Sequence, residues 1–172
     1  ITDWRTHWQQ GDFPFLFVQI APHRGMVPEI REAQLVSWEK TPKTAMAVIT
    51  DVGEETDIHP KKKQPVGERL ALAARAIAYG ERLEYSGPVF RSMKVSGNRA
   101  VLEFDHVGGG LAAAEGGLQD FTIAPAGSTN FVPATASIEG KRIVVSSPEV
   151  PVPGAVRYGW ATWFVGSLFN KE

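Results

Sequence analysis

Phe15-Leu16-Phe17-Val18-Gln19-Ile20 is a short and almost continuous apolar run. Runs of this kind are typical of strands that are buried on both faces, as in parallel sheets. Ala45-Met46-Ala47-Val48-Ile49-Thr50 is a second run of the same kind. Pro28 can occupy the first position of a helix between them, which gives a strand, a helix and a strand in succession. This order predicts an α/β arrangement with a right-handed parallel crossover.

Two further helices extend this pattern to about residue 82. Ile1, Trp4 and Trp8 fall at helical spacing before Gly11, so we expect a helix at the start of the chain. The clearest helical stripe follows the second apolar run and ends at Gly80. Its apolar members are Val66, Leu70, Ala73, Ala74 and Ile77. We therefore expect residues 1–82 to form an α/β domain.

The period of the apolar pattern changes from about 3.6 to 2 residues near position 83. Residues 90–95 and 100–104 flank Ser96-Gly97-Asn98-Arg99, which is a hairpin signal. Short strands separated by frequent turns are typical of a β-sandwich, which we predict for residues 83–172. Further strand candidates are 121–123, 134–138, 143–146 and 155–163.

Composition excludes several classes of function. With a formal net charge of -1, the chain has no overall electrostatic attraction to nucleic acid or to an anionic membrane. The absence of cysteine excludes disulfides, thiolate metal sites and a cysteine nucleophile. No apolar run has the length of a membrane span. The chain has no signal peptide and opens without Met on a patterned helix, so we expect a fragment or a processed product.

The loop between the second apolar run and the clearest helix carries four acids and one histidine. It runs Asp51-Val52-Gly53-Glu54-Glu55-Thr56-Asp57-Ile58-His59-Pro60. Ligands of open α/β sheets lie at the carboxyl ends of the strands, where this loop begins. A serine hydrolase needs a histidine as its base and a carboxylate that orients it, and a histidine and a carboxylate on one short loop meet that geometry. On spacing alone, an Asp-x-His in a loop is more often a helix cap or a surface hydrogen bond than a catalytic pair. A metal site from Asp51, Asp57 and His59 is a further alternative.

Several short blocks resemble the sialate O-acetylesterase family, a carbohydrate-esterase branch of the SGNH hydrolases. The blocks appear in family order and cover nearly the whole chain. They are Asp3-Trp4-Arg5 with Trp8, Gly11-Asp12-Phe13-Pro14-Phe15, Phe17-Val18-Gln19, Arg31-Glu32-Ala33-Gln34, Asp57-Ile58-His59-Pro60-Lys61, Lys63-Gln64, Gly67, Arg69-Leu70, Ala74-Arg75, Tyr79-Gly80, Ser86-Gly87-Pro88, Val156-Arg157-Tyr158, Trp160 and Asn170.

The resemblance implies the carboxyl-terminal part of an SGNH, flavodoxin-like parallel sheet followed by a small β-sandwich. The family's catalytic base maps onto His59. SGNH enzymes usually place aspartate three residues before this histidine, but Thr56 stands there. Asp57 is therefore the first choice for the orienting carboxylate and Asp51 the second, with a backbone carbonyl as a third alternative.

The resemblance also implies an activity and what it requires. The family removes O-acetyl groups from sugars by acyl transfer to water, and needs no metal or organic cofactor. Its nucleophile block, a Gly-x-Ser, does not occur here, because no serine has glycine two positions before it. We expect the serine and the oxyanion hole to come from a missing amino-terminal half, as part of the same protein or as a second chain. The parent protein is expected to be secreted or periplasmic.

Two other functions fit the sequence. Trp160 and Trp163 could stack on sugars in a non-catalytic carbohydrate-binding module, although alternation along 155–163 predicts at least one of them in the core. A structural segment of a larger glycan-degrading protein would need no site at His59. Arg31, Glu32 and Gln34 are predicted to form a buried salt-bridge bracket for the sheet rather than a functional cluster.

Overall fold

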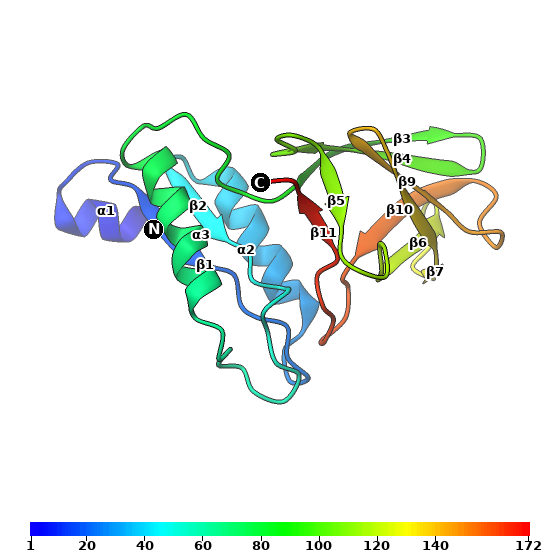
Figure 1. The fold of residues 1–172 in the computed structure, drawn as a ribbon, viewed down its shortest axis with the longest axis horizontal. Helices are drawn as coiled ribbons and strands as arrows, with labels where there is room; N and C mark the ends of the chain where they lie inside the picture. Colours follow the sequence, from blue (N-terminus) through cyan, green and yellow to red (C-terminus); the bar gives the residue numbers. More distant parts are fainter. The chain divides into compact units, whose positions relative to one another are not determined.

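Three α-helices and two parallel strands make up the first of two units in the computed structural model, which describes residues 1–172. This unit comprises Ile1–Ser86, and Gly87–Glu172 forms the second, which holds strands but no helix (Figure 1). The chain is thus of mixed helix and sheet, and most of its strand pairs are antiparallel. No helix combines the length and the hydropathy that a membrane span needs.

The two apolar runs form the parallel pair, with β1 (Phe15–Val18) beside β2 (Thr44–Ala47). The helix α2 (Pro28–Lys40) connects them, as the succession of strand, helix and strand predicts. All four residues of β2 are buried, but all four residues of β1 are only half-buried. The expectation that both runs are buried on both faces is therefore wrong for β1, since both α2 and α3 pack on β2 whereas α3 is the main helix that packs on β1.

The helix α3 (Gln64–Ile77) covers the strand pair with its apolar stripe. Ala73 is fully buried, and Val66 packs against a small core of Ala21, Ile49 and Val52. Gly80 has a positive φ of 72°, in keeping with its expected place just after the helix.

Arg5 joins the short helix α1 (Thr2–Trp8) to the amino-terminal ends of both strands. Its guanidinium donates hydrogen bonds to the carbonyl oxygens of Phe13 (2.8 and 3.1 Å), Pro42 (2.9 Å) and Lys43 (3.3 Å). The residue is 7% exposed. These carbonyls belong to the chain just before each strand, so one side chain fixes the points where β1 and β2 begin.

The second unit is built from β3 to β11 around one core. Its largest sheet has the order β3-β4-β9-β8, and a smaller sheet has the order β10-β6-β7. Ile123, Ile143, Val145 and Val150 are almost completely buried in this core. The strands are β3 (Val89–Ser96), β4 (Arg99–Asp105), β5 (Leu111–Ala113), β6 (Phe121–Pro125), β7 (Val132–Pro133), β8 (Thr135–Glu139), β9 (Arg142–Ser146), β10 (Pro153–Tyr158) and β11 (Leu168–Asn170).

The strand expected over 155–163 ends at Tyr158. Gly159 follows with a positive φ of 60°, which turns the chain, and a side chain there would collide with the Phe164 ring, so glycine is needed at this position. Trp160 and Trp163 lie outside any strand and are half-buried, so the prediction that at least one of them lies in the core is wrong.

Removing the Tyr158 hydroxyl should destabilise the second unit. This oxygen accepts hydrogen bonds from the backbone N–H groups of Ser167 (2.7 Å) and Leu168 (3.1 Å). Tyr158→Phe leaves both groups without that acceptor, so we expect the free energy of unfolding to fall by about 1–3 kcal/mol. Urea denaturation measures this change. Tyr79→Phe is the control because Tyr79 is 78% exposed, and equal losses in the two variants would contradict the prediction.

Candidate functional site

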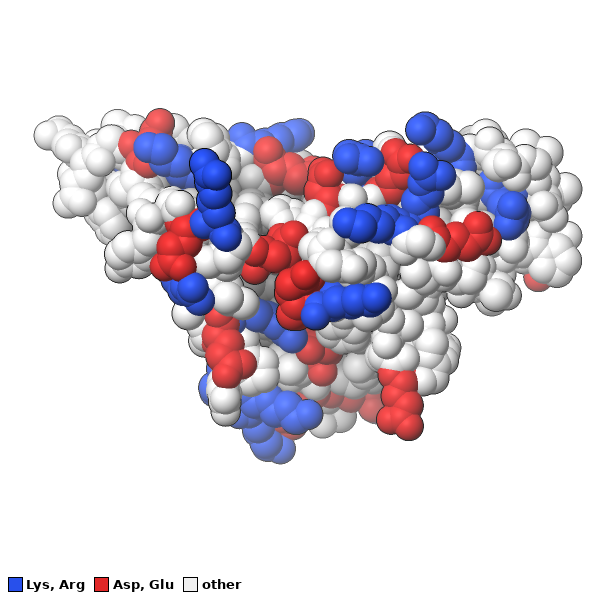
Figure 2. All heavy atoms as spheres, turned by 45° about the horizontal axis from the view of Figure 1, so that its top comes forward, with Lys and Arg blue, Asp and Glu red and all other residues white.

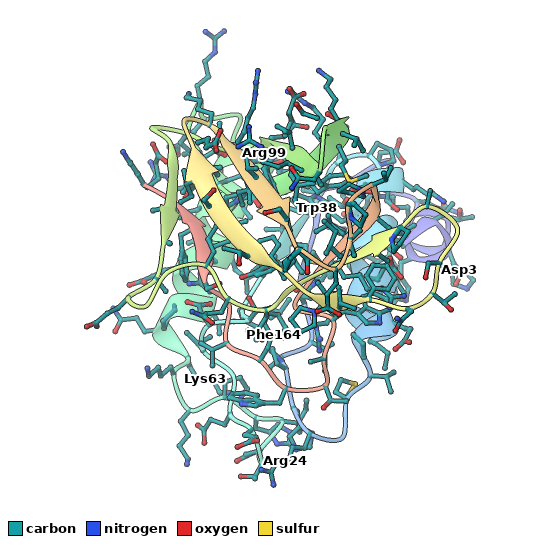
Figure 3. All side chains as sticks on the ribbon, turned by 90° about the vertical axis from the view of Figure 1, so that its right-hand side faces the viewer. Asp3, Arg24, Trp38, Lys63, Arg99 and Phe164 are labelled. Atoms are coloured by element: carbon teal, nitrogen blue, oxygen red, sulfur yellow. The ribbon has the colours of Figure 1, made fainter.

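The loop that carries His59 lies beside the loop that follows β1. Both leave the carboxyl ends of parallel strands, and both extend from the same end of the first unit, where Figure 3 labels Arg24 and Lys63. The Arg24 guanidinium lies 2.9 Å from the Glu55 carboxylate, and the Arg24 backbone N–H donates to the Glu55 carbonyl. A side chain at Gly53 would come within 3.1 Å of the Pro22 carbonyl oxygen. Glycine therefore permits the close packing that aligns the two loops.

Asp51, at the start of the loop, is held by Arg69 of α3. The two guanidinium nitrogens lie 2.6 and 2.7 Å from the two carboxylate oxygens, and Arg69 also donates to the Val48 carbonyl. Asp51 raises the pKa of Arg69, chiefly through the hydrogen bond between their side chains. Two parallel hydrogen bonds of this kind fix the orientation of the carboxylate as well as its distance from the guanidinium. Asp51 thus ties the helix to the end of β2.

Asp57 is the carboxylate that lies at His59. Its Oδ1 accepts a hydrogen bond from the His59 backbone N–H (2.9 Å) and lies 3.4 Å from the imidazole Nδ1. The hydrogen bond from that backbone N–H is the main cause that lowers the pKa of Asp57, so the carboxyl is ionised at neutral pH. With Nδ1 facing the carboxylate, Nε2 is the nitrogen left to exchange a proton with another group.

Glu54 and Lys61 close the loop across its base. The ammonium of Lys61 lies 3.0 Å from the Glu54 carboxylate, which also accepts the Lys61 backbone N–H. The hydrogen bond between these side chains lowers the pKa of Glu54 and raises that of Lys61. Sequence reasoning missed this pairing, because the lysine belongs to a run of three. The result is a short closed loop that presents Asp57 and His59 at its tip.

The His59 side chain is open to solvent. It is 84% exposed, and the Asp57 side chain is 47% exposed. No serine or threonine hydroxyl of the chain contacts the imidazole, whose one polar partner is Asp57. The arrangement can therefore accept a proton from a group that approaches from outside the chain. The alternative of a metal site finds no support in the donor set, because no three carboxylate or imidazole side chains lie together.

Gln34 of α2 completes the end of β1. Its carboxamide oxygen accepts the Ile20 N–H (2.8 Å), and its nitrogen donates to the Val18 carbonyl (3.3 Å). Gln19 in turn donates to the Arg31 carbonyl (3.0 Å). Gln34 therefore braces the strand through hydrogen bonds to the backbone, and the prediction of a buried salt-bridge bracket is wrong for Glu32, which is exposed. These bonds hold the carboxyl end of the strand where the site begins.

Charge is mixed on the face that Figure 2 shows, where Lys and Arg side chains alternate with Asp and Glu. Ion pairs between such side chains occur in both units. On this face no single sign of charge dominates.

Comparisons with known proteins find relatives that are named as carbohydrate esterases. No protein-family model matches it. It is 28% identical over 190 residues to the sialate O-acetylesterase of Homo sapiens, which covers 95% of this chain and 36% of that protein. It is 33% identical over 129 residues to the sialate O-acetylesterase of Mus musculus, covering 62% of this chain and 24% of that protein.

A solved structure agrees with these sequences. A carbohydrate acetylesterase from Xanthomonas citri superposes with a TM-score of 0.90 at 43% identity, over 98% of this chain and 41% of that chain. The chain thus spans well under half the length of each relative. It is a homologue of the sialate O-acetylesterases and of this bacterial carbohydrate acetylesterase.

Proposed function

We propose that residues 1–172 are the histidine-bearing part of a carbohydrate O-acetylesterase, in which His59 is the general base. The observation that carries the proposal is the Asp57 carboxylate 3.4 Å from Nδ1 of an imidazole that stands at the carboxyl end of a parallel strand pair. In this proposal β1 and β2 are part of an SGNH-type parallel sheet, and the second unit is a small β-sandwich.

The proposed reaction is acyl transfer from an acetylated sugar to water. A serine outside this chain loses its proton to Nε2 of His59 and attacks the acetyl carbonyl. The imidazolium then protonates the leaving sugar oxygen, and an acetyl-enzyme forms. Water, deprotonated by His59 in turn, hydrolyses it. Asp57 holds the ring and stabilises its charged form throughout.

The unpaired edge of β1 supports a partner on this side of the sheet. Phe15 and Phe17 are only half-buried, and Trp4, which stacks on Phe15 at 5.1 Å between ring centroids, is 50% exposed. Unpaired edges with apolar side chains are sites of strand addition. We propose that the missing half, which carries the serine, adds its sheet here. The parent protein is proposed to be secreted or periplasmic, as the family resemblance implies.

Hydrolysis of p-nitrophenyl acetate tests the proposal. Residues 1–172 alone should show no rate above that of the His59→Ala variant, because an oxyanion hole and a nucleophile are absent from the proposed half-site. Adding the remaining part of the parent protein should restore a rate that His59→Ala abolishes. A robust rate from residues 1–172 alone, lost in His59→Ala, would overturn the proposed division of the site.

A second candidate is a non-catalytic carbohydrate-binding module. The half-buried Trp160 and Trp163 favour it, since aromatic rings near a surface stack on sugars. A glycan array separates the two functions. Binding that survives His59→Ala but is lost in Trp163→Ala would favour the binding module.

A further inference from the structure

Arg157 lies on the face of β10 that is turned away from the core of the second unit. Its neighbours Val156 and Tyr158 pack against that core, and successive strand residues point to opposite faces. Arg157 pairs in register with Thr122 of β6, the central strand of the sheet β10-β6-β7, and β10 is an edge strand of that sheet.

The Arg157 guanidinium stacks on two aromatic rings. Its Cζ lies 4.0 Å from the ring centroid of Phe131 and 4.5 Å from that of Trp160. All three residues are half-buried. Stacking on planar rings restrains the guanidinium while leaving the N–H donors at its edge available in one plane. The stack also occupies one face of Trp160, so that face is not available to a sugar ring.

Arg157 differs from every other arginine of the second unit in having no acidic partner. Arg91 lies 3.4 Å from Glu103, Arg99 lies 3.3 Å from Glu139, and Arg142 lies 3.6 Å from Glu103. The Arg157 guanidinium instead makes cation–π contacts alone. A cation that is restrained, half-buried and without a counter-charge is prepared to receive an anion.

We propose that Arg157, Phe131 and Trp160 form a carboxylate-binding site for an acidic sugar. A guanidinium fork matches a carboxylate with two parallel hydrogen bonds, and the rings hold the fork in place before the ligand arrives. The carboxylate follows from the side-chain geometry. The choice of a sugar as its carrier rests on the proposed function as a carbohydrate esterase.

The test measures binding of two sugar acids to residues 1–172 by NMR titration. N-acetylneuraminic acid and glucuronic acid are compared with their neutral methyl esters. We expect a Kd of the order of 1–10 mM for at least one acid, a range that corresponds to about 3–4 kcal/mol of binding free energy. Its methyl ester should bind at least about tenfold more weakly, because one charge-assisted pair contributes on that scale.

Variants identify the site. Arg157→Gln should abolish binding of the acid, and Arg157→Lys should weaken it because an ammonium lacks the planar fork. Arg99→Gln is the matched control, since Arg99 is a surface arginine of the same unit with its own acidic partner. Thermal unfolding checks that each variant is folded. If Arg157→Gln does not fold, Arg157→Lys, which keeps the positive charge, tests the site in its place.

Three results would overturn the site: no binding of either acid, equal binding of acid and ester, or equal binding by Arg157→Gln. His59→Ala should leave binding of the acids unchanged. Because neither probe is acetylated, this outcome is independent of esterase activity. If the acids do not bind at Arg157, the proposed catalytic role of His59 is unaffected. If His59 proves not to be the base, the carboxylate site is likewise unaffected.

Discussion

Arg5→Met is expected to lower the free energy of unfolding of the first unit by about 2–4 kcal/mol. The side chain is buried, and its guanidinium satisfies the carbonyls of Phe13, Pro42 and Lys43 where the two strands begin. Methionine retains the apolar stem but leaves these acceptors without their donor. A partly buried polar group that loses its hydrogen-bond partner costs about 1–3 kcal/mol. We expect the total to be smaller than the sum for all three carbonyls, because water can hydrogen-bond to some of them. Such a loss is a large part of the roughly 5–15 kcal/mol that is typical of a domain.

Urea denaturation followed by circular dichroism at helical wavelengths measures this loss, because the helices belong to the first unit only. Arg75→Met is the matched control. Arg75 lies on α3 and pairs with Glu81 at the surface, where such pairs contribute about 0–1 kcal/mol. If the two variants lose stability equally, Arg5 does not fix the starts of the strands in the way that its hydrogen bonds indicate.

Local signals in the sequence predict most elements of this fold. The apolar runs predict β1 and β2, Pro28 marks the first residue of α2, and the turn at Ser96–Arg99 predicts the hairpin of β3 and β4. Each signal lies within the element that it predicts. The end of β10 is different, because the alternation continues to residue 163. The strand stops where Gly159 meets the Phe164 ring, a contact that only the folded chain reveals.

In the candidate site too, the sequence predicts contacts between neighbouring residues but not contacts between residues far apart in the chain. Asp57 and His59 are two residues apart, so their pairing is local, and sequence reasoning places Asp57 first. Asp51 lies on the same short loop as His59, but Arg69 holds it from a helix 18 residues later. Nothing near Asp51 in the sequence indicates that partner. Whether an edge of β1 is paired depends on the order of the strands in the sheet, which the local sequence of β1 does not indicate.

His59→Ala, made in the proposed longer esterase, should reduce kcat by about 10³–10⁴-fold. Losing the base of a serine hydrolase removes proton transfer at every step, and a loss of this size equals about 4–5.5 kcal/mol of transition-state stabilisation. KM should change little, because the imidazole is proposed to act on the reacting serine and not to bind the sugar. His7→Ala is the control, since His7 is an exposed residue of α1. A His59→Ala enzyme with more than about a tenth of the original kcat would exclude His59 as the base.

The two aspartates separate the chemistry of the site from its support. Asp57→Asn removes the charge at Nδ1 of His59 and should lower kcat by at least about tenfold with little change in Tm, because Asp57 is half-exposed and pairs locally. Asp51→Asn removes one side of the Arg69 fork and should lower the Tm of the first unit, since it leaves a partly buried guanidinium with a neutral partner. Thermal unfolding and acetate release, measured on both variants, assign each role. If Asp51→Asn lowers kcat more than Asp57→Asn at an unchanged Tm, then Asp51 is the orienting carboxylate and the proposed pairing of Asp57 with His59 is wrong.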